Sequence, residues 1–560
     1  MKLAAFVFSA AVFLPAGLAA EKPAVWPVDS LIKVFPDDAP GASRAPDQNW
    51  LVPRNGHASV QFAVRSAEKL SDLAVSVKLG GGLKVQVRRA GYVPVRANPP
   101  QSPLDEVARK APGKFPDPLF EEMPFALAAN ETVPVWITIY APAAAKPGVR
   151  KGTAVFSAGK TKIASVPFRV EVSRAVIPAR QSLKVTNWFT LEPQSVAKSF
   201  NLGASPEAAT FDSPHYWEIV ENVARFLGAQ RQNVIITPVM SLVEPKLSAS
   251  GAISYDFSRF DRWVDIFTRA GAADVIEGAH LMDRVNGYDT ALRIPAYVVE
   301  NGAVKRQALT ADDPRVEAHL NLFLPALYAH LKEKGWLNRY VQHVLDEAHG
   351  TEPPIYVKYT ALVRKNLPGI KTIDAIDQAA FILGESCDIW VPQLGRFDDA
   401  IPAIRKHVEG GGEAWFYTCL FPQNRHLNRF IDYPLLKTRL LHWFNYRYDF
   451  TGFLHWGGNY WSPDPFDNVE PPLEDGHQLP AGDAFLTYPW REKNTIRSSI
   501  RFEAMREGIE DYELLRVVAA KDPERARALA RKAIPELTDY VRDVQAFRRL
   551  QAELLTAASR

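Results

Sequence analysis

Cysteine is scarce in this sequence, and the spacings that mark metal sites are missing. Only Cys387 and Cys419 occur among the 560 residues, too few for a scaffold built on disulfides. The sequence contains no CxxC pair, Cys/His cluster or HExxH motif, so the usual zinc sites are excluded and we expect no metal and no other cofactor. Stability must therefore come from a hydrophobic core.

An excess of either charge is also lacking. The chain carries 66 Lys and Arg against 63 Asp and Glu, a formal net charge of +3, and it has no basic run. We therefore expect neither a nucleic acid nor an anionic membrane as a partner. The hydrophobic share of 47% and the charged share of 23% are typical of a folded globular protein rather than a disordered one.

Long apolar runs are confined to the N-terminus. Lys2 precedes an almost wholly apolar stretch up to Leu14, and small residues follow as far as Ala20. This arrangement predicts a secretory signal peptide over residues 1–20, too short to span a membrane and cleaved near Ala20. No later segment approaches the length of a membrane span, so we expect a periplasmic or secreted protein.

Residues 21–180 alternate apolar and polar residues in short runs separated by Gly, Pro and Asn. The runs at 59–64, 73–77, 83–87, 133–140 and 166–172 have this period of two, which is typical of half-buried strands. The pattern predicts an antiparallel β-sandwich. It shows no aromatic platform, so we expect an accessory, structural role, and sugar binding by this domain stays open.

From residue 181 onward, short apolar strands alternate with amphipathic helices. Eight candidate strands occur, at 183–189, 233–239, 274–280, 340–347, 371–377, 388–393, 413–420 and 452–461, with helices at 213–228, 260–270, 314–334, 354–366, 400–409, 434–448 and 496–519. This alternation and count predict a (β/α)8 TIM barrel over residues 181–520. Residues 281–313 and 462–495 are expected to be long loops, and residues 521–560 a C-terminal helical extension.

Polar and aromatic residues gather at the predicted carboxyl ends of these strands, where barrel enzymes build their sites. Six of the thirteen tryptophans fall between residues 388 and 490. Aromatic faces stack on the apolar faces of sugar rings while nearby polar groups bond the hydroxyls. The expected substrate-binding residues are therefore Asn187, Trp188, His280, Trp390, Gln393, Tyr417, Trp456, Asn459 and Trp461.

Two adjacent carboxylates, Asp346 and Glu347, end the fourth predicted strand. Charged groups are costly at the end of an apolar strand unless they are paired or used, so we take these two as the catalytic residues. A retaining glycosidase usually needs a second carboxylate across the bond. Strand seven carries Glu413 at its wrong end, and Asp377 after strand five is the rival. The missing partner indicates a substrate that supplies its own nucleophile, as a 2-acetamido group can.

With these motifs the chain resembles glycoside hydrolase family 123, the exo-acting β-N-acetylgalactosaminidases. The resemblance covers nearly the whole mature chain, from sandwich to barrel, and rests on residues 186–189, 345–347, 388–392, 415–418, 456–461, 482–489 and 501–513. The last of these is expected to be a helix laced by ion pairs between i and i+4 neighbours. Ala348 and His349 depart from the family pattern after the Asp-Glu pair, which leaves a sister family open.

The resemblance implies release of terminal β-linked GalNAc from a glycan by substrate-assisted, retaining catalysis. Glu347 would be the general acid/base, with a pKa raised by Asp346 and by desolvation. Asp346 would orient the acetamido N–H and stabilise the oxazolinium intermediate. Tyr417 would bond the acetamido carbonyl, and Asn459 and Trp456 would line the sugar pocket.

Two alternatives remain at this point. One is a different glycosidase that uses Glu347 with Asp377 or Glu277 and needs no acetamido group. The other is a non-catalytic glycan-binding protein in which the aromatic residues hold sugar and Asp346 and Glu347 only bond hydroxyls. The choice of GalNAc over GlcNAc, the linkage, the natural glycan and the oligomeric state are not determined by the sequence.

Overall fold

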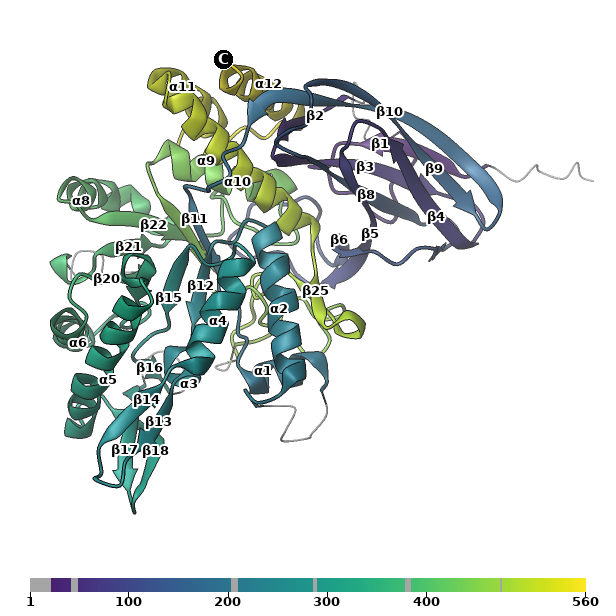
Figure 1. Cartoon of the computed structure of the whole chain (residues 1–560). Helices are drawn as coiled ribbons and strands as arrows, with labels where there is room; N and C mark the ends of the chain where they lie inside the picture. The colour runs from purple at the N-terminus through teal and green to yellow at the C-terminus, as the bar shows by residue number, and fades with distance from the viewer. Residues whose placement is uncertain (1–21, 42–48, 203–209, 286–289, 378–383, 474–475) are drawn as a thin grey trace, which may run out of the picture.

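The computed structural model describes residues 22–41, 49–202, 210–285, 290–377, 384–473 and 476–560 (Figure 1). The predicted signal peptide at 1–20 lies outside the described residues. Within those residues, no helix has the length and apolar character needed to cross a membrane. A two-sheet β domain comes first, an eight-stranded barrel follows, and two helices end the chain.

The first domain packs two five-stranded sheets face to face. One has the order β1 (Ala24–Val28), β3 (Gly56–Arg65), β8 (Thr132–Ala141), β5 (Lys84–Val95), β6 (Gly113–Phe120). The other has the order β2 (Asn49–Arg54), β10 (Thr161–Val176), β9 (Gly148–Ala158), β4 (Leu70–Leu79), β7 (Phe125–Leu127). The inward positions of both sheets form one core that includes Trp50, Phe62, Phe156 and Phe168. The predicted sandwich is confirmed, although β2 and β10 run parallel.

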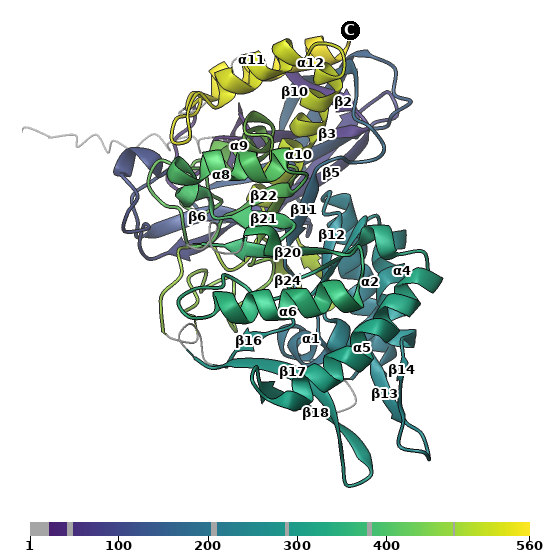
Figure 2. The same cartoon turned by 90° about the vertical axis from the view of Figure 1, so that its left-hand side faces the viewer.

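The second domain contains the eight predicted parallel strands. Their order is β11 (Lys184–Asn187), β23 (Gly452–His455), β22 (Glu413–Tyr417), β21 (Ile389–Pro392), β20 (Lys371–Ile376), β19 (Tyr340–Gln342), β15 (Val275–Gly278), β12 (Val234–Thr237). Alternate side chains fill the interior, among them Val341, Ile373, Trp415 and Leu454. Figure 2 shows β20, β21 and β22 side by side within this sheet. The predicted barrel is confirmed.

The barrel closes at a seam between β11 and β12, the two ends of the strand order. Asn233, just before β12, joins them with its backbone and its side chain. Its N–H donates to the carbonyl of Val185 (3.3 Å), its Oδ1 accepts from the Val185 N–H (2.9 Å), and its Nδ2 donates to the carbonyl of Leu183 (3.1 Å). One buried asparagine thus takes the place of a strand ladder.

Helices follow the strands and cover the outside of the barrel. They are α2 (Pro214–Ala229), α4 (Ser258–Arg269), α5 (Pro314–Glu333), α6 (Pro353–Asn366), α8 (Phe397–Glu409), α9 (Leu435–Arg447) and α10 (Ile500–Ala519), with two short helices, α1 (Pro193–Phe200) and α3 (Val239–Leu242). Side-chain caps fix several starts: Ser213 accepts from the Tyr216 N–H, and Ser499 from the Phe502 N–H. The C-terminal extension consists of α11 (Pro523–Ala533) and α12 (Val544–Ala558).

The segments predicted as long loops contain small sheets, which corrects that part of the prediction. Residues 281–313 hold β16 (Asp283–Arg284), β17 (Leu292–Glu300) and β18 (Ala303–Thr310). Asn301 and Gly302 connect β17 to β18, both with positive φ (52° and 74°), as a tight hairpin turn requires. Two further hairpins are β13 (Glu244–Leu247) with β14 (Ile253–Asp256), and β24 (Tyr488–Trp490) with β25 (Thr495–Arg497).

Helix α10 lies between the sandwich and the barrel (Figures 1 and 2). Its buried charges pair mainly with other elements. Glu503 pairs with Arg88 (3.0 Å) and Arg501 with Asp117 (2.8 Å), both in the sandwich, while Asp511 pairs with Arg439 of α9 (2.7 Å). Among the described ion pairs of the helix, only Glu503–Arg506 (2.7 Å) is internal. The expected lacing between i and i+4 neighbours is therefore wrong: the helix joins the two domains.

Candidate active site

Asp346 and Glu347 lie in the turn that follows β19, at the carboxyl end of the barrel. Glu347 has a left-handed backbone (φ 45°), which is uncommon for a residue with a Cβ and typical of functional sites. Arg284 holds the turn by donating to the carbonyls of Asp346 (3.0 Å) and Glu347 (3.3 Å). Arg284 is itself fixed by Glu352, whose Oε1 accepts from its Nε (2.9 Å). The strained turn therefore rests on a rigid support.

The two carboxylates point to different sides of the barrel mouth. Oδ1 of Asp346 lies 3.9 Å from Nε2 of His280. Oε1 of Glu347 accepts the hydroxyl of Tyr417, at the end of β22. Burial and the neighbouring Glu347 hold the pKa of Tyr417 well above its usual value, so this hydroxyl stays protonated and can only donate to the carboxylate.

The carboxyl group of Asp346 is hard to ionise. Burial and the charge of Glu347 raise its pKa to about 8, against the opposing charges of His343 and Arg284. Its side chain is still 38% exposed, toward the open pocket. Asp346 is therefore a group whose charge a bound cation would stabilise.

A fully buried charge network lies beneath this pair. His343 places Nε2 2.7 Å from Glu277 and Nδ1 3.0 Å from Asp374, and none of the three side chains is exposed. Burial alone would lower the pKa of His343, but hydrogen bonds and charge from the two carboxylates outweigh it and raise the pKa to about 10. The ring is therefore an imidazolium that donates from both nitrogens. Tyr356 also donates to Asp374 (2.7 Å).

His280 lies between this network and Asp346. Its ring centroid is 4.3 Å from that of His343, and burial together with the charge of His343 holds its pKa well below the usual value. Donor atoms of His280, His343 and Asp374 lie within 4.8 Å of one another, a spacing that a metal ion could bridge. His343, however, already contacts Glu277 and Asp374 through its two ring nitrogens, so the arrangement fits a hydrogen-bonded charge network.

Aromatic side chains form the walls of the mouth. Trp188 donates from its indole to Glu277 (3.0 Å) and meets His280 edge to face, with centroids 5.2 Å apart. A pocket of about 690 Å3 opens there, lined by Trp188, His280 and Asp346. Trp456 packs at the mouth of the barrel interior, and its indole donates to Asp483 (3.1 Å). Beside it Tyr460 is 40% exposed, an accessible aromatic ring that sequence reasoning did not single out.

The rival carboxylates are already engaged. Asp377 accepts from Arg396 (3.1 Å) and from Nε2 of Gln393 (3.3 Å), which places Gln393 at the mouth beside Tyr417. Glu277 is buried and accepts from Thr186 (2.9 Å) as well as from Trp188 and His343. Neither is poised as a free nucleophile in this structure.

Two predicted substrate-binding residues lie on the wrong face of their strands. Trp390 stacks on His407 of α8 (4.2 Å between centroids) and donates to the carbonyl of Cys387 (3.1 Å). Asn187 donates to Gln232 (2.7 Å) and contacts Met505 of α10. Because side chains alternate across a strand, the neighbours Val391 and Thr186 face the interior instead. The expectation that Asn187 and Trp390 line the mouth is corrected.

Two others brace a loop. Both amide atoms of Asn459 bond the backbone of Thr190, at 2.8 and 3.0 Å. The indole of Trp461 donates to the carbonyl of Thr487 (2.7 Å), and its ring packs on Phe200. The amide of Asn459 and the indole N–H of Trp461 therefore hold the segment after β23 in place. Of the predicted set, the structure brings Trp188, His280, Gln393, Tyr417 and Trp456 to the mouth with Asp346 and Glu347.

Sequence reasoning missed the supporting residues Arg284, Asp374 and Asp483. Asp374 offered one signal, a carboxylate in the middle of an apolar strand, which is costly unless paired. Asp483 supports Trp456 and lies 3.2 Å from Nε2 of His455. Arg284 follows no recognisable motif, because its partners come from the turn some sixty residues later in the chain.

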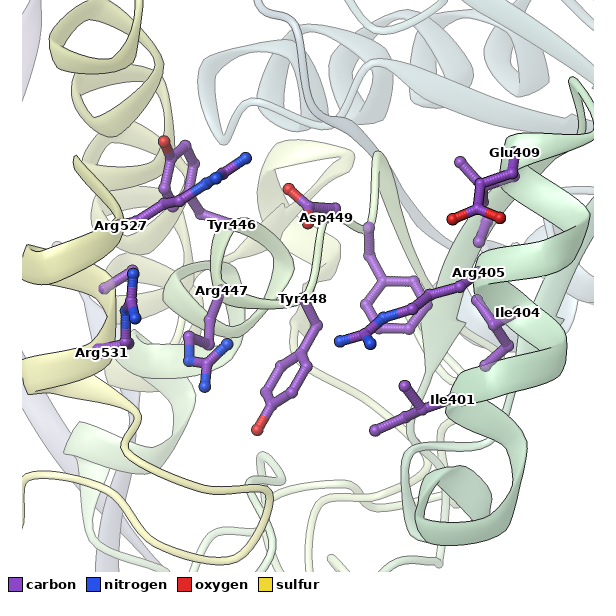
Figure 3. Close-up of a pocket in the computed structure, with 14 residues that line it drawn as sticks. Ile401, Ile404, Arg405, Glu409, Tyr446, Arg447, Tyr448, Asp449, Arg527 and Arg531 are labelled. Carbon is purple, nitrogen blue, oxygen red and sulfur yellow. The ribbon is translucent and has the colours of Figure 1, made fainter. Parts of the chain in front are cut away.

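A separate cavity of about 530 Å3 lies at the amino ends of the strands, between α8, the segment after α9, and α11 (Figure 3). Tyr448 stands in it between Arg447 and Arg405, with Arg527 and Arg531 on the far wall (Figure 3). None of the predicted site residues lines it. Barrel enzymes work at the opposite end, so the candidate active site is the mouth that holds Asp346 and Glu347.

Comparisons with known proteins agree with this geometry. A family model described as glycoside hydrolase 123, catalytic domain, matches residues 192–518, more than half of the chain. No curated protein matches the sequence. A solved family 123 glycoside hydrolase from Clostridium perfringens, studied for glycolipid glycan hydrolysis, is 16% identical with a TM-score of 0.73; the match covers 96% of this chain and 97% of that one. A family 5 xyloglucanase from Bacteroides ovatus is 8% identical over 83% and 98% of the two chains, and its TM-score of 0.33 carries no argument.

Proposed function

The chain belongs to glycoside hydrolase family 123, and we propose that within this family it is an exported exo-β-N-acetylgalactosaminidase. The observation that carries the proposal is the pair Asp346 and Glu347, adjacent in the chain yet aimed at different partners, His280 and Tyr417. Such a pair can act on two atoms of one sugar at once, the leaving oxygen and the 2-acetamido group. The fold relative from Clostridium perfringens, which acts on glycolipid glycans, supports a glycan substrate.

In the proposed mechanism Glu347 is the general acid/base. The acetamido carbonyl oxygen bonds to C1 as the C1–O bond to the leaving sugar breaks. Glu347, which must be protonated in the substrate complex, gives its proton to the leaving oxygen. A water then adds to C1 of the oxazolinium, loses its proton to Glu347 and reopens the ring. The configuration is retained without a covalent bond between enzyme and sugar.

Asp346 is proposed to bind the acetamido N–H and the positive charge that develops there. Its raised pKa fits this role, because a cationic intermediate favours the ionised form. The charges of His343 and Arg284 favour the ionised form of Asp346, and Arg284 also holds the backbone of its turn. Tyr417 is proposed to turn its hydroxyl from Glu347 to the acetamido carbonyl when the sugar binds.

A panel of aryl glycosides tests the substrate. The purified protein is expected to release nitrophenol from β-GalNAc glycosides, more slowly from β-GlcNAc, and not from β-Gal, which lacks the acetamido group. Comparable turnover of the β-Gal glycoside would favour a two-carboxylate glycosidase. Binding without release from any of them would favour a glycan-binding protein.

Variants of the pair test the mechanism. Glu347→Gln is expected to lower kcat by about 10²–10⁴-fold on a substrate with a poor leaving group, and far less on an activated aryl glycoside. Asp346→Asn is expected to impair both, because formation of the oxazolinium suffers. Equal losses for both substrates in Glu347→Gln would contradict its role as the acid.

Inhibitors separate the proposal from its rival. A thiazoline that mimics the cyclised sugar is expected to inhibit competitively. If it fails to inhibit, or if a 2-fluoro sugar traps an adduct on Asp377, the substrate-assisted mechanism is wrong and Asp377 is the nucleophile.

Export is the remaining part of the proposal. It is supported by the charged and apolar pattern of residues 1–20. Expression of the full chain in a Gram-negative host, followed by fractionation and N-terminal sequencing, is expected to give a periplasmic or secreted protein that begins at Glu21.

A further inference from the structure

We infer that a cleft between the sandwich and the barrel is the subsite for neutral sugars that carry the cleaved residue; this inference rests on the function proposed above. The cleft has a volume of about 810 Å3. Its walls are residues 96–101 after β5 of the sandwich, the segment 420–423 after β22, and part of residues 468–480 in the segment after β23. We call it the inter-domain cleft.

The directions of the Asp346 and Glu347 side chains indicate on which side of the mouth the leaving sugars lie. Asp346 faces His280 and the pocket beside Trp188. Glu347 faces Tyr417, the last residue of β22, from which the chain runs through Cys419 directly into the cleft wall at Leu420 and Phe421. A general acid must reach the oxygen of the leaving group. The leaving sugars therefore lie on the Glu347 side, toward the segment that forms the cleft.

The mouth and the cleft are separated by side chains that pack against both. Leu420, Phe421 and Trp456 all pack against the cluster that fills the barrel interior, which includes Tyr417. Leu420 and Trp456 also pack against the cluster beneath the cleft, which joins β5 and β6 of the sandwich to the segment after β23. The cleft therefore lies beside the mouth, on the side of Leu420 and Trp456.

The walls of the cleft are tied to one another before any ligand arrives. Gln423 accepts from the backbone N–H of Gln101 (2.9 Å) and donates to the carbonyl of Leu420 (3.2 Å). Glu470 accepts from the backbone N–H groups of Arg96 and Ala97, at 2.9 and 3.3 Å. A binding surface held in place in this way loses little entropy when it binds. The tie between Gln101 and Gln423 also makes the sandwich part of the cleft.

The chemistry of the walls fits uncharged sugars. Phe421 and the prolines at 99, 100, 472 and 480 offer apolar faces to the C–H faces of sugar rings. Gln101 and Gln478 are exposed, and their side-chain amides bond no other described residue, so both can bond hydroxyls. The charges of Arg96 and Glu470 offset each other at 3.5 Å. The cleft therefore offers no net attraction to an acidic sugar.

The test compares a substrate that reaches the cleft with one that does not. The probes are an aryl β-GalNAc glycoside and neutral trisaccharides with terminal β-GalNAc joined 1,3 or 1,4 to lactose. The double variant Gln101→Ala/Gln478→Ala is expected to lower kcat/KM about 10-fold or more for the better trisaccharide, and less than about 2-fold for the aryl glycoside. Phe421→Ala is expected to show the same selectivity.

Gln307→Ala is the matched control, since it removes an amide from β18, outside the cleft, and should change neither substrate. Equal losses on both substrates, or none, would overturn the inference while leaving the proposed function intact. Failure of the wild-type protein to cleave any β-GalNAc substrate would instead sink the proposed function. A GalNAc–glucuronate disaccharide cleaved better than GalNAc–glucose would refute the preference for neutral sugars.

Discussion

Glu347 combines three unusual features in one residue: a left-handed backbone, a carbonyl held by Arg284, and a carboxylate bonded by Tyr417. A residue with a side chain adopts this conformation only when its surroundings impose it. Here those surroundings come from Arg284 of β16 and Tyr417 of β22, which lie far apart in the sequence. The position of the proposed acid therefore depends on its neighbours at the mouth, which can be tested one at a time.

Tyr417 is the first such neighbour. Tyr417→Phe is expected to lower kcat/KM about 10–100-fold, because a buried, protonated donor at the reacting groups is lost. Steady-state kinetics on the aryl β-GalNAc glycoside measure the effect, and Tyr446→Phe in the distant cavity of Figure 3 serves as the control. Unchanged kinetics for Tyr417→Phe would remove this residue from the mechanism.

Trp456 is the second residue at the mouth that can be tested by substitution. Trp456→Ala is expected to lower kcat/KM about 10-fold or more, since the ring positions the sugar and its loss frees Asp483 from a hydrogen bond. The kinetics are compared with those of Trp490→Ala, an aromatic of the β24–β25 hairpin. Near-normal turnover of Trp456→Ala would assign the ring to loop support.

The raised pKa of Asp346 predicts how the stability of the fold changes with pH. Its pKa in the folded chain, about 8, lies above the ordinary 3.8, so the folded state disfavours its charge and stability is lost as pH rises between these values. Asp346→Asn removes that cost. Its melting temperature is expected to equal that of the wild type near pH 4 and to exceed it by about 1–2 °C near pH 8. A variant that melts lower than the wild type at pH 8 would contradict this.

For single residues, the sequence was sufficient to predict a position at the mouth where that position follows from the order of the strands along the chain. Asp346 and Glu347 end an apolar strand, and Tyr417 ends another. The sequence was insufficient where a residue's position depends on which face of a strand it occupies or on a partner distant in the chain. Thr186 and Val391 face inward, so Asn187 and Trp390 cannot, and the alternation alone could have shown this. The pairing of His343 with Glu277 and Asp374 depends on three strands meeting in space.

Among the elements, α10 departs most from what its sequence suggests. Its alternating charges are typical of a solvated helix with internal ion pairs, yet they are buried and bind the sandwich, the residues just after α2, and α9. Glu503 is the centre of this set. Burial opposes its charge, but Arg506 and Arg88 hold its pKa well below the usual value. Its contribution to stability is therefore present above pH 4.5 and lost as the pH falls below it.

Glu503→Gln is expected to lower the free energy of unfolding by about 3–5 kcal/mol at pH 7, because Arg88 and Arg506 are left as buried charges without a counterion. Urea unfolding measures the change. Glu524→Gln, whose side chain is 77% exposed, is the control and should cost less than about 1 kcal/mol. Similar losses in the two variants would mean that the buried pairs do not hold the helix.

The hairpin of β17 and β18 shows what element-level prediction can and cannot supply. Residues 292–310 alternate around Asn301-Gly302, the strongest short-range hairpin signal, so the strands could have been predicted from the chain. The way the hairpin packs against the rest of the protein could not be predicted from the sequence. It depends on the hydroxyl of Tyr297, which donates to the carbonyls of Met240 (2.6 Å) and Val243 (2.7 Å), more than fifty residues earlier.

For the whole molecule, the eight strands and the sandwich could be predicted because each depends on a local period and a count. The joining of the domains could not, since it rests on pairs such as Arg501–Asp117, which are 384 residues apart. Those pairs imply that the barrel is not independent of the sandwich.

A chain that begins at residue 181 is therefore expected to be insoluble or inactive. It would leave Arg501, Glu503 and Glu510 without Asp117, Arg88 and His57. Soluble yield and activity of residues 181–560, compared with residues 21–560, measure this. A soluble and active truncated barrel would show that the sandwich is dispensable for folding.

The seam at Asn233 gives the barrel a definite place of weakness. Every other neighbouring pair of strands shares a backbone ladder, whereas β11 and β12 meet through Asn233, which bonds the backbone of Val185 and of Leu183. A closed sheet separates most easily where two strands share the fewest hydrogen bonds. Both strands at this seam lead to the mouth: β11 to Trp188 and β12 to the pocket wall at Pro238. We therefore expect the barrel to open first beside the mouth, and the amide of Val185 to exchange with solvent deuterium sooner than the ladder amides of β20 to β22.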